Sequence, residues 1–64
     1  MKLYALTELG RRVARDKQGE DDEMRVLYFI RDHKTATDSE LSVVADSYVT
    51  KRLVRRGLVK ELTE

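Results

Sequence analysis

The spacing of apolar residues along the chain predicts four helices between two short terminal strands. Residues 2–6 form an apolar-rich run, and the next residue, Thr7, is a good helix N-cap. This run is therefore expected to be a strand that leads into a helix. That helix should cover residues 8–17 and end at Gly19. Its inward side consists of apolar residues three or four positions apart, which are Leu6, Leu9, Val13 and Ala14.

A second helix is predicted over residues 23–33, with Asp21 or Asp22 as its N-cap. Residues 24–30 are apolar on almost every side of a helix, so this helix should be the central and most buried one. Residues 26–30 alone would also fit a buried strand, but the capping residues favour the helix.

A short third helix is predicted after residues 35–37, which are expected to be a connector. Thr37 and Glu40 have the spacing of a capping box, and the helix should extend from there to Val44 or Ala45. Its inward residues are expected to be Leu41, Val44 and Ala45.

The fourth helix is predicted from a cap at Asp46 or Ser47 to Gly57, which is a natural C-terminal stop. Its inward residues are expected to be Val49 and Leu53, with Thr50 and Val54 at the edge. The residues that follow, 58–62, alternate enough to form a second strand.

These elements predict one mainly α domain of the α+β class over residues 1–64. The last two helices should form a helix-turn-helix in a winged-helix-like arrangement, and the N- and C-terminal strands should form a two-stranded antiparallel sheet. A chain of 64 residues allows only one small domain. No cysteine is present, so neither a disulfide nor a thiolate metal site can stabilise the fold.

The net charge of +1 conceals two segments of opposite sign. An acidic cluster lies in the middle of the chain and consists of Asp16, Glu20, Asp21, Asp22 and Glu23. Basic residues crowd the C-terminal part, where Lys51, Arg52, Arg55, Arg56 and Lys60 occur. One end of the molecule is therefore expected to be a cationic patch.

The basic face of the fourth helix, over residues 47–56, is the candidate functional site. Its outward residues are predicted to be Ser47, Tyr48, Lys51, Arg52 and Arg55. Arginine can bind guanine through two hydrogen bonds, which favours Arg52 and Arg55 as base contacts and Lys51 as a phosphate contact in a DNA major groove. A solvated helix face without a partner is the alternative, and the position on the second helix of a helix-turn-helix favours DNA binding.

Two segments resemble parts of the winged helix-turn-helix regulators that are abundant in archaea and their viruses. Residues 4–11, YALTELGR, are similar to the segment that this family places on its last strand and following helix. Residues 49–59, VTKRLVRRGLV, resemble its recognition helix and the exit into its wing. The N-terminal region of archaeal phenylalanyl-tRNA synthetase alpha subunits carries related segments. The resemblance implies a DNA-binding transcriptional regulator.

The order of the two segments departs from that family, because the strand and helix that normally come last stand first here. This order indicates a circular permutation, in which residues 58–62 and 2–6 still pair but no hairpin tip joins them. The wing is therefore expected to be missing or open. The distance from Leu41 to Gly57 is also shorter than the family's usual spacing.

These departures suggest a homodimer, because a lone short helix without a wing would contact few phosphates. The candidate contact surfaces are Tyr28, Phe29 and the open strand edge at residues 2–6 or 58–62, with core packing as the alternative use of the aromatic residues.

Enzyme chemistry is not predicted, because His33 is the only histidine and no glycine-rich phosphate loop occurs. His33 is better explained as a favourable charge near a helix C-terminus. Asp21, Asp22 and Glu23 could hold a hard cation, but consecutive carboxylates on a helix diverge, so no metal is expected. No cofactor or small-molecule ligand is indicated.

The longest apolar run is too short to span a bilayer and the N-terminus lacks a signal-peptide pattern, so a cytoplasmic location is expected. Double-stranded DNA is the expected partner. The alternatives are a protein-interaction module of the same fold and an RNA-binding or tRNA-binding domain.

Overall fold

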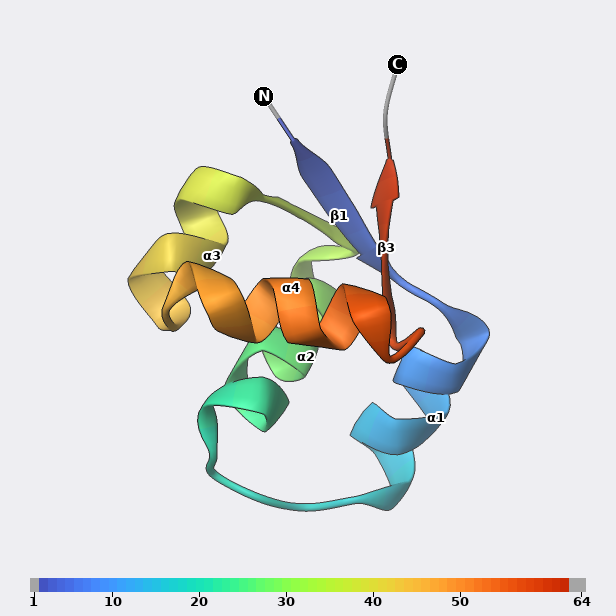
Figure 1. Cartoon of the computed structure of the whole chain (residues 1–64). Helices are drawn as coiled ribbons and strands as arrows, with labels where there is room; N and C mark the ends of the chain where they lie inside the picture. The colour runs from blue at the N-terminus through green and yellow to red at the C-terminus, as the bar shows by residue number, and fades with distance from the viewer. Residues whose placement is uncertain (1, 63–64) are drawn as a thin grey trace.

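The computed structural model describes residues 2–62, which form four helices and one small sheet. In chain order the elements are β1 (Leu3–Leu6), α1 (Glu8–Asp16), α2 (Asp22–His33), β2 (Thr35–Thr37), α3 (Asp38–Val44), α4 (Ser47–Arg55) and β3 (Val59–Leu62). Figure 1 shows α4 crossing in front of α2, with β1 and β3 side by side above them. The predicted mainly α fold of the α+β class is confirmed.

The sheet has three antiparallel strands in the order β2-β1-β3, so the predicted two-stranded sheet was one strand short. The terminal strands pair as predicted, with Leu3 opposite Leu62 and Leu6 opposite Val59. The expected connector at residues 35–37 is the third strand, β2, whose Ala36 lies opposite Tyr4 and is fully buried. No hairpin joins β1 to β3 within the described residues, since the chain between these strands passes through every other element.

The chain reverses between α2 and β2 at Lys34, which has a φ of 69° and a ψ of −47°. Only glycine adopts a positive φ without a steric cost, so a lysine here carries backbone strain. Because a lysine does not mark a turn as a glycine would, nothing in the sequence indicated that the chain reverses here, and β2 was missed.

The inner side of α1 differs from the prediction at one position. Leu9 was expected to face inward, but it is 47% exposed, whereas Gly10 and Ala14 are buried. The helix crosses the backbone of Leu58 so closely that a Cβ at position 10 would collide with the Leu58 carbonyl. Gly10 therefore takes the inward position, and Leu9 is turned towards solvent.

The ends of α1 are set by side-chain contacts. Thr7 is the N-cap, as predicted, and its hydroxyl oxygen accepts a hydrogen bond from the Gly10 N–H at 3.0 Å. The helix ends at Asp16, before Gly19, so Gly19 is not its stop. Lys17 has an extended backbone, and its carbonyl accepts a hydrogen bond from the Tyr28 hydroxyl of α2 at 3.1 Å.

The central helix is α2, which packs against α1, α3, α4 and two strands. Val26, Leu27 and Ile30 are at most 1% exposed, which confirms a buried helix rather than a strand. Asp21 is the N-cap, because its carboxylate accepts a hydrogen bond from the Met24 N–H at 2.9 Å.

Two aromatic residues of α2 lie half-buried at the edge of the core. Tyr28 and Phe29 both pack against the core cluster. The Phe29 ring stacks on His33, whose Nδ1 lies 2.9 Å from the Phe29 carbonyl oxygen. These contacts give both aromatic residues a structural use within the chain.

The predicted capping box opens α3. The N–H and hydroxyl of Thr37 donate to Glu40 Oε1 at 2.9 and 3.2 Å, and these bonds hold the pKa of the Glu40 carboxyl below its ordinary value of 4.5. Leu41 is buried as predicted, and Val44 and Ala45 pack half-buried against the core.

Candidate nucleic-acid interface

The fourth helix, α4, follows α3 after a turn of two residues, Ala45 and Asp46. Asp46 occupies the N-cap position, where its carbonyl rather than its side chain accepts a hydrogen bond, from the Val49 N–H at 3.0 Å. Val49 is 3% exposed and Leu53 is fully buried, so both anchor α4 in the core as predicted. Thr50 is also buried, at 6% exposed, and not at the edge as expected.

Gly57 ends α4 in the left-handed conformation that the sequence predicted, with a φ of 81°. The Gly57 N–H donates to the Val54 carbonyl and the Leu58 N–H donates to the Leu53 carbonyl, both at 3.0 Å. These are the two hydrogen bonds of a Schellman motif, which satisfies carbonyls that a helix end leaves unpaired. The motif fixes where the helix stops and where β3 begins.

The outward face of α4 carries the five predicted site residues, all of them exposed: Ser47, Tyr48, Lys51, Arg52 and Arg55. We call these five residues the α4 face. The guanidinium of Arg52 lies over the Tyr48 ring, 5.6 Å from its centroid, in a cation–π contact. Within residues 2–62, Lys51 and Arg55 take part in no ion pair.

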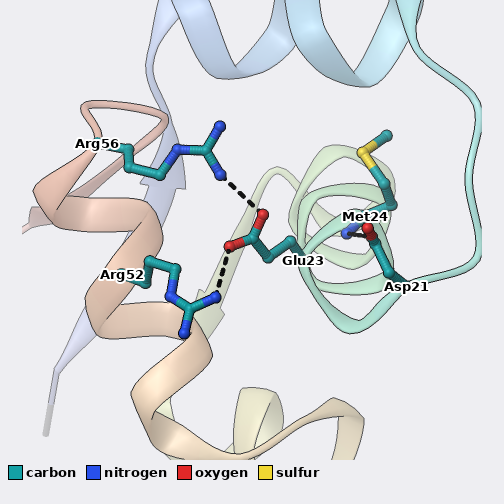
Figure 2. Close-up of polar contacts among 5 residues, drawn as sticks. All are labelled: Asp21, Glu23, Met24, Arg52 and Arg56. Atoms are coloured by element: carbon teal, nitrogen blue, oxygen red, sulfur yellow. Dashed lines mark hydrogen bonds and ion pairs between the residues drawn. The ribbon is translucent and has the colours of Figure 1, made fainter.

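One carboxylate of α2 binds two arginines of the C-terminal basic segment (Figure 2). Glu23 Oε1 lies 2.8 Å from Arg56 Nη1, and Glu23 Oε2 lies 3.5 Å from Arg52 Nη1. The Glu23 side chain is 24% exposed, whereas the arginine side chains are more than half exposed. Glu23 therefore neutralises part of the positive charge of α4 and holds Arg52 against α2.

The sequence did not predict the contacts of Glu23. The acidic cluster and the basic segment were both recognised, but nothing in the sequence specified that the first turn of α2 lies beside α4. Asp21, Asp22 and Glu23 line one surface hollow together with Tyr48 and Arg52. In residues 2–62 no group of three or more acidic, histidine or cysteine side chains is placed to hold a metal ion.

Residues 4–11 and 49–59 meet in space, although they lie at opposite ends of the chain. The Thr7 N–H donates to the Leu58 carbonyl at 3.1 Å, and the Thr7 hydroxyl donates to the Gly57 carbonyl at 2.6 Å. The start of α1 is thereby fixed to the end of α4.

No protein-family model, curated protein or solved structure matches this chain. Among residues 2–62, no helix has the length and apolar character needed to cross a membrane. The geometry of the described residues is therefore the basis for inferring a function.

Proposed function

We propose that this protein binds double-stranded DNA by inserting the α4 face into the major groove, as the DNA-binding domain of a transcriptional regulator. The observation that carries this proposal is the division of α4 into two sides. Val49 and Leu53 lock one side into the core, and the five polar residues of the α4 face all lie exposed on the other. A rigid helix with such a face is suited to groove recognition.

Four of the five residues of the α4 face have a role in this proposal that their chemistry supports. Arg55 and Arg52 carry the planar donor groups that bind guanine through two hydrogen bonds. Lys51 is a compact charge suited to a phosphate. Ser47, in the first turn of α4, is placed where hydroxyl and backbone N–H groups contact phosphates.

The contact between the two resemblance segments also supports this proposal. A permuted winged-helix domain requires its first strand and helix to pack against the end of its recognition helix, and Thr7 makes that connection to Gly57 and Leu58. Within the described residues no hairpin joins β1 to β3, as a missing or open wing requires.

The proposal is tested by fluorescence anisotropy with a labelled duplex at several salt concentrations. The C-terminal basic segment offers four exposed side chains for this contact, those of Lys51, Arg52, Arg55 and Arg56. If all four neutralise phosphates, affinity should fall about 100-fold between about 50 and 200 mM salt. No binding at about 50 mM salt would reject the proposal.

Variants locate the binding surface. Replacing Arg52 and Arg55 by alanine should abolish binding while the circular-dichroism spectrum is retained. The matched control is Arg12→Ala with Arg25→Ala, which removes the same charge from exposed positions on α1 and α2 that form no ion pair within residues 2–62. Equal losses in both double variants would show that only total charge matters. Preference for RNA in competition would favour an RNA-binding domain.

A further inference from the structure

A groove lined by basic residues lies away from α4. It consists of two adjoining surface hollows that share Arg11 and Arg31, one between the sheet and the C-terminal part of α2, and one between α1 and α2. We call this surface the basic groove. Its basic residues are Arg11, Arg15, Lys17, Arg31, Lys34 and Lys60.

No carboxylate lines the basic groove, although two lie beside it. Asp16 contacts Arg15 at 3.3 Å and Asp32 contacts Arg31 at 3.1 Å, and both aspartates are 60% exposed. Exposed ion pairs between sequence neighbours are weak, so an anionic ligand can replace them. The other four basic residues form no ion pair within residues 2–62, so the groove attracts anions.

Lys34 provides a second observation at the same place. It is the only non-glycine residue with a positive φ among the described residues, and it lines the first hollow. A glycine would adopt this conformation without steric cost. Strained positions of this kind cluster at functional sites, and here the strain places an ammonium group at the groove.

The lining of the groove favours a sugar–phosphate backbone over an acidic peptide. Three of its cations are arginines, whose planar donor groups match phosphate oxygens. The six cations extend over both hollows, which suits a backbone that carries a phosphate at every nucleotide. Phosphate contacts need only cations on an accessible surface.

The basic groove and the α4 face are separate surfaces. No residue of α4 lines either hollow. Helix α2 lies between α4 and the groove: it contacts α4 near Glu23, and its residues Tyr28 and Arg31 line the groove. A straight duplex lying along the α4 face would therefore leave the groove accessible. We infer that the basic groove holds the backbone of a second duplex segment, so that one molecule joins two stretches of DNA; this inference rests on the proposed function of α4.

The test is a bridging assay with the full chain. One duplex is fixed on beads, a second duplex carries a fluorophore, and the protein is added at about 50 mM salt. Wild type should capture the labelled duplex. The variant Lys34→Gly with Lys60→Gln should lose most of this capture, by about tenfold or more, while it still binds a single short duplex through α4. The control Arg12→Gln with Arg25→Gln removes the same charge outside the groove and should retain capture.

Folding is controlled within the same experiment. Lys34→Gly relieves the strained backbone, so its melting temperature should rise while bridging falls. Loss of bridging in a more stable protein cannot be explained by unfolding.

The outcomes separate this inference from the proposed function. The inference is overturned if wild type binds one duplex but captures no second one. It is also overturned if the groove variant captures as much duplex as wild type, which is the result expected if a homodimer bridges through two α4 faces. If Arg52→Gln with Arg55→Gln, introduced into the groove variant, leaves single-duplex binding unchanged, the proposed function of α4 fails instead. A labelled polyglutamate peptide that binds through Lys34 and Lys60, without DNA capture, would assign the groove to an acidic protein partner.

Discussion

Replacing Glu23 by glutamine should lower the stability of the protein and raise its affinity for DNA. Glu23 contacts Arg56 at 2.8 Å and Arg52 at 3.5 Å. A phosphate that approaches the α4 face must compete with this carboxylate for the same guanidinium groups. The substitution removes the competitor and keeps the size of the side chain.

The magnitude follows from the exposure of the partners. Both arginine side chains are more than half exposed, so each contact contributes about 0.5 kcal/mol to folding, and the two together about 1 kcal/mol. For a domain of this size, a loss of 1 kcal/mol lowers the melting temperature by about 5 °C. Because DNA binding no longer has to break these contacts, the affinity should rise by about fivefold, which corresponds to the same 1 kcal/mol.

The assay measures thermal unfolding by circular dichroism and duplex binding by anisotropy at about 50 mM salt. Glu20→Gln is the matched control, because it makes the same charge change at an exposed position that forms no ion pair within residues 2–62. It should change both quantities less than Glu23→Gln. Unchanged or weaker DNA binding by Glu23→Gln would refute the view that Glu23 competes with DNA for Arg52.

Three further predictions concern the fold and the assembly. Gly10→Ala should destabilise the protein by about 3 kcal/mol in chemical unfolding, because the new methyl group would collide with the Leu58 carbonyl, and a change below about 1 kcal/mol would contradict that close packing. The lowered pKa of Glu40 stabilises the folded state above pH 4.5, and this contribution is lost as the pH falls through the folded-state pKa. Glu40→Gln should therefore melt below wild type at about pH 7, with a difference that shrinks as the pH is lowered through the folded-state pKa; a constant difference would show that titration of Glu40 is not the cause. The homodimer that the sequence suggested, because a lone short helix without a wing would contact few phosphates, would give twice the chain mass of 7.5 kDa in light scattering, and a single species at 7.5 kDa would exclude it.

Local sequence patterns predicted the elements whose geometry depends on neighbouring residues. The capping box of Thr37 and Glu40 and the left-handed Gly57 each involve contacts within a few positions, so their residue types were sufficient. The same patterns left the N-cap of α2 open between Asp21 and Asp22, and the structure has Asp21. The anchors Val49 and Leu53 followed from helical spacing alone, and with them the exposed side of α4.

Features that depend on contacts between distant segments were not predictable in the same way. Strand β2 exists because Lys34 accepts a strained conformation and Ala36 fits opposite Tyr4, and neither condition leaves a local signal. Leu9 was misplaced because the spacing rule favours the larger apolar residue, whereas the approach of Leu58 admits only Gly10.

In the candidate site, too, local features could be predicted and contacts between distant segments could not. Exposure of the five residues of the α4 face could be derived from the period of one helix. The contacts of Glu23 with Arg52 and Arg56 join positions far apart in the chain, and so does the convergence of Arg11, Arg31 and Lys60 in the basic groove. Charge totals indicated that such contacts were possible, but only the packing of α1, α2 and α4 determines the partners.

The central claim is that the α4 face binds duplex DNA, and a chemical-shift map tests it most directly. Isotope-labelled protein carrying Lys34→Gly and Lys60→Gln, which weakens the basic groove, is titrated with a mixed-sequence duplex at about 50 mM salt. We expect the largest amide shifts in α4 (Ser47–Arg55), centred on Lys51, Arg52 and Arg55. Shifts confined to α1 and the sheet, with α4 unchanged, would contradict the claim.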